Sequence, residues 1–420
     1  MTAAVFVLLL LLSVPVAFVL LGTALAYIEI SGNEVLFQSF SQQLFSGIEK
    51  YGLLAIPLFM LAGEIMHRGG LIRRLIGLAS IFVSGLRGGL AYINLLANMM
   101  MASIVGSATA QISIMTQAMV PEMERAGYRR DFSAATTAAG GLLSPIIPPS
   151  MLFVIFGVLG QIAIGDLFIA GIIPGLLLTL GFILVVTVLG FVHDFPKGDW
   201  LSKREMLQAA LNGLPSAAVP VIIVGGILSG IFSPTESAAA AAVVAVVIGR
   251  FVHRELDLGE FPEMLQRTAL NSTMVLFLIA TANVFGWVII FEEVPQRLTL
   301  WLTELSSDPF IFMLLVSASL LLIGAFIDSI AALIVVVPLL LPIAQNSYGI
   351  DPFHFGVVVC INLVVGILTP PVGTGLFISA TLARVAPGKI FVALAPFLLV
   401  TIAVLVLLCW QPWLVTGVLR

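Results

Sequence analysis

Charged side chains are scarce in this chain, because Asp, Glu, Lys and Arg together make up 10% of its 420 residues. The net charge of −4 at pH 7 lacks the basic excess that nucleic-acid binding requires. Two cysteines are present, Cys360 and Cys409, and their spacing fits neither a disulfide framework nor a metal site. No nucleophile–base pair or set of metal ligands is visible, so the sequence gives no support to an intramembrane enzyme.

Apolar residues are correspondingly abundant in the sequence. They account for 60% of the sequence, and the mean hydropathy is +1.16. Long stretches carry no charge at all, among them 91–121 and 392–419. Stretches of about 20 such residues are typical of membrane spans. We therefore expect an all-α protein that crosses a membrane several times. Residues 2–31 lack the basic start of a signal peptide and are expected to form two short spans, or one span kinked at Pro15.

Two proline-rich stretches interrupt otherwise apolar segments: Ser144–Ser150 (SPIIPPS) and Leu368–Gly373 (LTPPVG). Proline cannot continue a helix, because it lacks the amide hydrogen and collides with the preceding turn. At membrane depth the freed backbone groups need partners inside protein or around a polar cavity. These stretches predict two broken spans, over about 132–159 and 353–382. A plain proline kink without a ligand is the alternative for either one alone.

The second break repeats the first at a constant distance. A shift of 222 residues carries Pro148-Pro149 onto Pro370-Pro371, Ser107 onto Ser329 and Pro174 onto Pro396. Helix breakers and turn residues rarely fall into register by chance, so the pattern predicts two homologous halves. We place them at residues 1–205 and 206–420. Paired interruptions in the two halves of a membrane protein are a sequence sign of a transporter's binding site.

Each half also contains an apolar run of about 30 residues with a small polar centre, which is long for one span. The first run, about 90–120, has Ser103, Gly106, Ser107 and Thr109 near its middle, and the second, about 310–342, has Gly324, Asp328 and Ser329. Each run predicts a re-entrant hairpin of two half-depth helices. One long tilted helix is the alternative.

Basic residues set the expected orientation. If 67–88 lies in the cytoplasm, fifteen of the 18 Lys and Arg residues fall on that side. The other three are Lys50, Arg297 and Arg420. This positive-inside bias makes the first hairpin enter from the cytoplasm and the second from the opposite side. The halves are then inverted, as in alternating-access transporters.

Hairpin tips and helix breaks offer hydroxyls, carbonyl oxygens and helix ends, which suit sodium. We expect one Na⁺ site in each half. The first would use Ser103, Gly106, Ser107, Ser144, Pro145, Pro148 and Ser150. The second would use Gly324, Asp328, Ser329, Thr369, Pro370 and Gly373. The positive N-terminal ends of half-helices could receive an anionic substrate near Thr109, Pro149, Ser150, Pro371 and Gly373. Asp328 is the strongest single candidate, because a carboxylate within a membrane segment is costly. A water-exposed hairpin mouth is its alternative placement.

Six short segments together carry a resemblance to a known family. They are Val14–Ala17, Ile56–Phe59 with Ala62–Glu64, Gly106–Thr109, Ser144–Ser150, Ser233–Glu236 and Leu368–Gly373. With them the whole chain resembles the large membrane subunit of a tripartite ATP-independent periplasmic (TRAP) transporter, of the DctM-like family.

This resemblance implies a sodium-coupled, elevator-type importer of an organic acid in the bacterial inner membrane. The acid would be a sugar acid, sialic acid or a dicarboxylate. The implied partners are a small four-span membrane subunit, expected as a separate chain, and a periplasmic substrate-binding protein. Gly375 departs from the family, in which many members carry asparagine there, and this affects the second ion site or a substrate contact. A stand-alone sodium–carboxylate or ion carrier of the same architecture is the alternative, and a channel is less favoured.

Overall fold

The computed structural model describes residues 2–12, 14–32 and 34–419, and these residues form helices, turns and one isolated β-bridge, between Arg87 and Lys197. In chain order the α-helices are α1 (Thr2–Leu11), α2 (Val16–Ser31), α3 (Glu34–Ser46), α4 (Ala55–Arg68), α5 (Leu71–Val83), α6 (Gly89–Val105), α7 (Ala108–Arg125), α8 (Arg130–Gly141), α9 (Met151–Gly160), α10 (Ile164–Val192), α11 (Lys203–Leu228), α12 (Pro234–Val247), α13 (Phe261–Phe291), α14 (Val294–Leu305), α15 (Pro309–Gly324), α16 (Ser329–Asn346), α17 (Pro352–Gly366), α18 (Thr374–Ala383), α19 (Pro387–Trp410) and α20 (Trp413–Thr416). Short helical turns are η1 (Tyr51–Leu54), η2 (Ile248–Val252) and η3 (Leu258–Glu260).

Long apolar helices confirm the expected polytopic all-α class. Within the described ranges, six helical segments are long and apolar enough to cross a bilayer alone, and two bent pairs raise the number to eight. Their exposed faces carry large apolar side chains, such as Leu180, Phe191 and Leu399. Lipid is the environment in which such faces are stable, since apolar surface of this extent is rare on soluble monomers.

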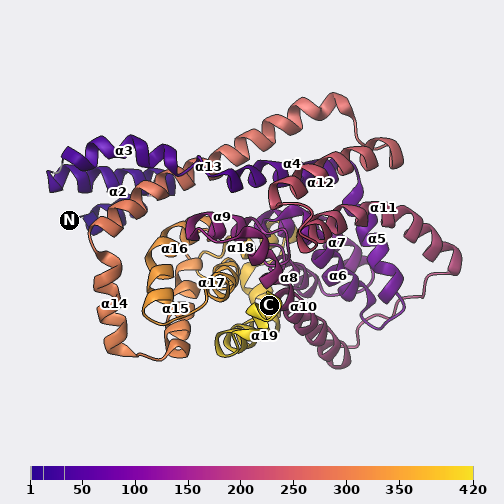
Figure 1. Ribbon diagram of the computed structural model, residues 1–420. Helices are drawn as coiled ribbons and strands as arrows, with labels where there is room; N and C mark the ends of the chain where they lie inside the picture. The colour runs from indigo at the N-terminus through magenta and orange to yellow at the C-terminus, as the bar shows by residue number, and fades with distance from the viewer. Residues whose placement is uncertain (1, 13, 33, 420) are drawn as a thin grey trace.

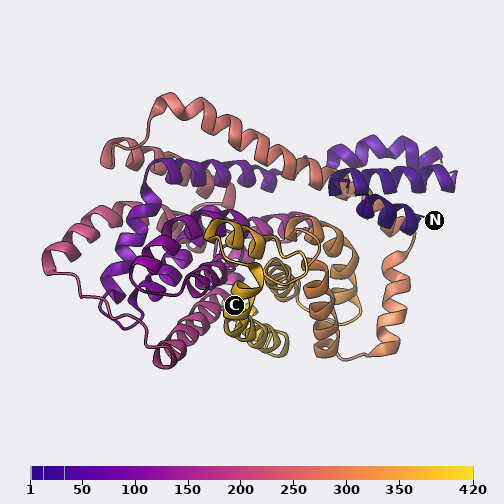
Figure 2. The same ribbon diagram turned by 180° about the vertical axis from the view of Figure 1, so that it is seen from behind.

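The helices are arranged as a layer and a block (Figure 1). α2, α3, α4, α12 and α13 lie along one edge of the molecule, where α12 packs on α4 and α13 packs on α2 and α3. Below this layer, α6–α9 and α15–α19 form the block, and the reverse view shows the same separation (Figure 2). α5 leads from the layer to the block at one end and α14 at the other. This arrangement keeps both hairpins and both breaks within one body.

Arg68, at the end of α4, ties the two halves together within the layer. Its guanidinium lies 3.0 Å from Glu64 and 2.7 and 2.9 Å from Glu260 and Glu263. The two latter carboxylates stand at the start of α13, so the contact joins segments nearly 200 residues apart. One cation shared by three carboxylates orders this end of the layer more than a single surface pair would.

The helices outside the hairpins and breaks follow the sequence expectations in part. Residues 2–31 form two helices, and Leu9 lies against Gly22, so α1 folds back on α2 rather than continuing as one kinked span. α13 is continuous from Phe261 to Phe291. α14 was not expected. The 222-residue shift would have found it, because the shift carries α5 onto α14 and both helices are amphipathic.

Both hairpins and both breaks form where the sequence places them. α6 and α7 turn at Gly106-Ser107, and α15 and α16 turn at 325–328. α8 stops at Gly141 and resumes as α9, while α17 stops at Gly366 and resumes as α18. Four helix C-termini and four helix N-termini therefore lie at the two turns and the two breaks.

The two halves pack crosswise. α7 of the first hairpin lies against α18 of the second broken span, and α16 of the second hairpin lies against α9 of the first. The 222-residue shift exchanges these two contacts, since it carries α7 onto α16 and α9 onto α18. Neither half can complete the interior of the block alone.

α15 and α17 cross at Gly324 and Gly366. Both residues are glycines, which allows the two backbones to touch. A Cβ placed on Gly366 would lie 2.5 Å from the backbone carbonyl carbon of Gly324. Backbone atoms on both sides cannot move aside as a flexible side chain would. Small residues allow this kind of close helix packing in membrane proteins.

We predict that Gly366→Ala lowers the free energy of unfolding by about 1–3 kcal/mol, because the added methyl group forces α15 away from α17. The apparent Tm of the purified protein in detergent measures the effect. Gly388→Ala is the matched control, since a Cβ at Gly388 meets no atom within 4 Å and alanine favours the helix. Equal Tm values for the two variants would contradict the assigned crossing.

The inverted repeat can be tested by labelling equivalent loops. The tips at Gly127 and Gly349 have φ of 94° and 63°, which disfavours cysteine there. Arg125 and Ser347 are exposed, lie 222 residues apart and have helical neighbours, so they are better probe positions.

We predict that a membrane-impermeant maleimide labels Arg125→Cys only from the cytoplasmic side and Ser347→Cys only from the opposite side. The parental chain is the unlabelled control, because Cys360 and Cys409 are both buried. Labelling of both probes from one side would rule out the inversion.

Candidate functional site

The two hairpin tips and the first break meet around a cavity of about 70 Å³ at the centre of the block. The first hairpin contributes Gly106, Ser107, Ala108 and Thr109, the first broken span contributes Pro145, Met151 and Leu152, and the second half contributes Asp328, Ser329, Ile330, Val364 and Ile367. Residues assigned from the sequence to two separate ion sites thus border one space.

The first tip is a sharp turn that requires glycine. Gly106 has a φ of 63°, a conformation that costs little without a Cβ. It sits against the first break, because a Cβ there would lie 3.7 Å from the carbonyl oxygen of Pro149. The hydroxyls of Ser107 and Thr109 are 3.2 Å apart. The tip therefore presents two hydroxyls where α6 ends and α7 begins.

The first break is buried and closes on itself. The Ser150 hydroxyl donates to the carbonyl oxygen of Pro145 at 2.5 Å and accepts from the amide of Phe153 at 3.2 Å, which caps α9. Such a cap satisfies one of the free amides at the helix start. The Ser144 hydroxyl is also buried, and it has no hydrogen-bond partner among the described residues. Among the described side chains of the first candidate set, the Ser144 hydroxyl is the one that is buried without a partner.

Asp328, on the second tip, is the one charged residue among the described residues that line the cavity. Asp328 caps α16, since its Oδ1 accepts from the amide of Ile330 at 2.9 Å, and its side chain is exposed. This exposure is compatible with the hairpin mouth expected from the sequence as the alternative placement of the carboxylate. Ser329 is buried and donates to the carbonyl oxygen of Leu363 at 3.0 Å, which binds the tip to α17.

The second break is more open than the first. Pro370, Pro371 and Val372 are exposed, while Gly373, with a φ of 27°, is buried. The amides of Val372 and Gly373 both donate to the carbonyl oxygen of Ala325 at 3.3 Å, so the break is tied to the second tip. The two similar proline-containing sequences therefore form one buried break and one exposed break.

The candidates divide into those that border the cavity and those that do not. Gly106, Ser107, Thr109, Pro145, Asp328 and Ser329 border it. Ser144, Pro148, Pro149, Ser150, Gly324, Thr369, Pro370, Pro371, Gly373 and Gly375 do not, although Pro149 borders a small void beside Gly106. Ser103 lies on α6, and its side chain is outside the described part of the structure.

Gly375 is packed rather than available to a ligand. A Cβ there would lie 2.9 Å from Cδ1 of Ile112 on α7 and 3.1 Å from Cδ2 of Leu368. Side chains from both halves thus fill the space that an asparagine would occupy. The departure from the family at this position comes with apolar packing between α7 and α18.

The sequence reasoning missed a buried amide network behind the first tip. Asn94 donates to Thr137 at 2.7 Å, Asn98 donates to Asn94 at 2.8 Å, and Gln111 donates to Asn98 at 2.9 Å. All four side chains are fully buried, and the network links α6, α7 and α8. Its signal in the sequence was polar residues four apart, at 94 and 98, within an apolar run.

Size and electrostatics limit what the cavity can hold. Sites for small organic molecules usually measure about 300–1,000 Å³, so about 70 Å³ suits a cation with its waters rather than an acid. The C-terminal ends of α6, α8, α15 and α17 turn negative dipole ends toward the interior, and the N-terminal ends of α7, α9, α16 and α18 turn positive ends toward it. Cation and anion can both be attracted to this region.

Comparison with known proteins agrees with this architecture. The family described as "Tripartite ATP-independent periplasmic transporter, DctM component" matches residues 3–414. The C4-dicarboxylate TRAP transporter large permease protein of Pseudomonas aeruginosa is 37% identical over 375 residues, which cover 89% of this chain and 88% of that protein. The sialic acid TRAP transporter large permease protein of Vibrio cholerae is 35% identical over 398 residues, which cover 95% and 93%.

The fold also matches a solved transporter. The crystal structure of the YdaH transporter of Alcanivorax borkumensis superimposes with a TM-score of 0.70 over 97% of this chain and 98% of that one, at 15% sequence identity. That likeness concerns the fold, whereas the family match and the close relatives concern ancestry. The chain therefore belongs to the DctM family of tripartite ATP-independent periplasmic transporters and is a multi-pass bacterial inner-membrane transport protein, not an enzyme.

Proposed function

We propose that this chain is the large permease subunit of a sodium-coupled importer of an organic acid. The observation that carries the proposal is the convergence of Ser107, Thr109, Asp328 and Ser329 on one ion-sized cavity. Hydroxyl, carboxylate and backbone oxygens are the ligands that a hard monovalent cation prefers. The exposed carboxylate of Asp328 is placed where an ion can reach it from water.

Sodium and substrate can be coupled through the hairpin tips. The second tip is bound to the second break by hydrogen bonds from Val372 and Gly373 to Ala325. A cation that draws the Asp328 end of this tip inward would also position the second break. The N-terminus of α18, which begins at Thr374, would then be held in place for a carboxylate group.

The layer and the block suit an elevator mechanism. Both hairpins and both breaks lie in the block, so the block can carry ion and substrate as one body (Figure 1). The layer, with its Arg68 cluster and lipid-facing helices, would remain fixed in the membrane. α5 and α14 connect the two parts at opposite ends and would absorb the displacement.

The relatives guide the choice of substrate and partners. Large permeases of systems for C4-dicarboxylates and for sialic acid are each at least 35% identical to this chain over most of its length. We infer a substrate of the same chemistry, a small acid with one or more carboxylate groups. The partners would be a small four-span membrane subunit and a periplasmic binding protein that delivers the acid.

We predict that proteoliposomes take up an organic acid only with an inward sodium gradient and all three components present. The panel would include C4-dicarboxylates, sialic acid and sugar acids, each measured with this chain alone and with its two partners. Uptake by this chain alone would favour a stand-alone carrier. Full uptake with potassium in place of sodium would disprove the proposed coupling.

We predict that Asp328→Asn raises the sodium concentration for half-maximal uptake by roughly tenfold, which corresponds to a loss of about 1.4 kcal/mol in ion binding. Asparagine still caps α16, so folding should be kept. Asp308→Asn is the control, because Asp308 caps α15 in the same way and does not border the cavity. An unchanged sodium dependence in Asp328→Asn would exclude this carboxylate from the ion site.

A further inference from the structure

A second and larger pocket, of about 350 Å³, lies outside the central site. It is formed by the loop between α7 and α8 with the start of α8, the end of α10 with the loop that follows, and the first three turns of α19. These are ends of membrane helices, and the surrounding loops carry many of the basic residues that place this side in the cytoplasm. The pocket thus lies at the expected level of the cytoplasmic lipid headgroups.

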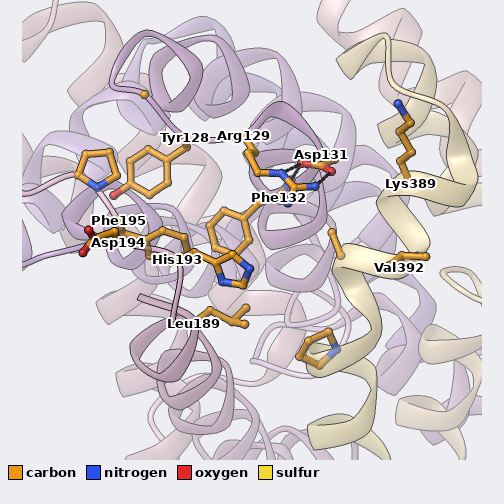
Figure 3. A pocket seen from close by; sticks show the side chains of 14 residues that line it. Tyr128, Arg129, Asp131, Phe132, Leu189, His193, Asp194, Phe195, Lys389 and Val392 are labelled. Carbon is orange, nitrogen blue, oxygen red and sulfur yellow. Dashed lines mark hydrogen bonds and ion pairs between the residues drawn. The ribbon is translucent and has the colours of Figure 1, made fainter. Parts of the chain in front are cut away.

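The pocket is polar at one end and apolar at the other (Figure 3). Arg129, Asp131 and Lys389 gather at one end, and Leu189 lies at the other. Val392, Ala393 and Pro396 line the same side of the pocket along α19. An amphipathic ligand would match this gradient, with its polar group toward the loops and its chain toward the bilayer.

Aromatic rings form a rigid wall between the two ends. The Phe195 ring centroid lies 4.7 Å from that of Phe132, 5.4 Å from that of Tyr128 and 6.4 Å from that of His193. Burial raises the pKa of Tyr128 to about 12, so the phenol stays neutral at physiological pH. The rings of Tyr128, Phe132 and Phe195 therefore offer a preformed surface without charge.

Two acids and two bases line the pocket, and three of these four side chains form ion pairs. Asp131 is held by Arg129, with oxygen–nitrogen distances of 3.1 and 2.5 Å, and Asp194 pairs with Arg87. Lys389 is exposed and makes no ion pair within the described part of the chain. One ammonium group is thus left to meet an anion at the mouth of the pocket.

The apolar end is continuous with the lipid-facing surface. Phe191 and Val192 at the end of α10 are 78% and 70% exposed, and Val392 on α19 is 73% exposed. These side chains flank the pocket on both helices that line it. An acyl chain could leave the pocket along this surface without crossing a polar region.

We propose that this pocket binds an anionic phospholipid of the cytoplasmic leaflet, with the phosphate at Lys389 and an acyl chain along α10 and α19. A lysine without an ion pair, placed between membrane helices on the cytoplasmic side, is suited to an anionic headgroup. The proposal needs only a chain placed in the membrane and is independent of the sodium coupling and the substrate proposed above.

Lipid retention by the full-length chain tests the proposal. The delipidated protein in detergent is titrated with dioleoyl phosphatidylglycerol, with zwitterionic dioleoyl phosphatidylcholine and with inorganic phosphate, and bound lipid is counted by native mass spectrometry. We expect phosphatidylglycerol to bind more tightly than phosphatidylcholine, and inorganic phosphate not to displace it. Equal binding of the two lipids, or displacement by inorganic phosphate at millimolar concentration, would overturn the proposal.

Two matched pairs of variants locate the lipid. Lys389→Gln should weaken phosphatidylglycerol binding about fivefold, the effect of one lysine near a headgroup, whereas Lys203→Gln, outside the pocket, should not. Ala393→Phe fills the pocket and should weaken both lipids, whereas Ala403→Phe, on an exposed face of α19, should weaken neither. The apparent Tm of each variant verifies folding. Unchanged binding in both pocket variants would place the lipid elsewhere.

Discussion

Backbone groups at the interrupted helices must find partners within the protein, because lipid offers none. Four helices end and four begin in the interior of the block, and each end leaves several amides or carbonyls without helical partners. Packing of each hairpin on the broken helix of the other half shields these ends from lipid, and hydrogen bonds between the tip and the break of one half satisfy some of their main-chain groups. Contacts such as the amides of Val372 and Gly373 on Ala325 then satisfy main-chain groups and position the tips at the same time.

A shared backbone plan does not impose shared chemistry on the two halves. The shift of 222 residues carries Asn98 onto Leu320 and Gln111 onto Leu333, so the amide network behind the first tip has no counterpart at the equivalent positions. The second half buries a different amide, that of Asn362, which donates to Ser317 at 3.0 Å. The second half carries Asp328 instead, at an exposed tip beside an open break. Buried hydrogen bonds thus surround the first tip, whereas the second tip is exposed. This asymmetry is what a transporter needs if one side of the cavity stays fixed while the other admits ions.

The few charged residues of the chain act at its edges. Arg68 joins α4 to the start of α13 through three carboxylates, and Arg129 holds Asp131 at the start of α8. In the interior, hydroxyls, amides and helix ends provide polarity at a smaller desolvation cost than ionised groups would. The charges therefore fix the ends of helices, while the central cavity is left to neutral oxygens and one carboxylate at its mouth.

The breaks, hairpins and repeat could be located from the sequence, because proline and glycine act through local backbone geometry that any environment must respect. Composition alone likewise determined the polytopic class. Contacts between segments far apart in the sequence determined which of the residues at the turns and breaks border the same cavity. Gly106 and Asp328 meet only because α7 packs on α18 and α16 on α9. Gly375 follows the second break in the sequence. In the structure the side chain of Ile112, from the other half, packs against Gly375, so this glycine is a packing residue and not a ligand. Neighbouring residues determine the local conformation of the backbone. Which side chains fill a given space depends on segments that are far apart in the sequence and pack together there, so only the tertiary structure decides it.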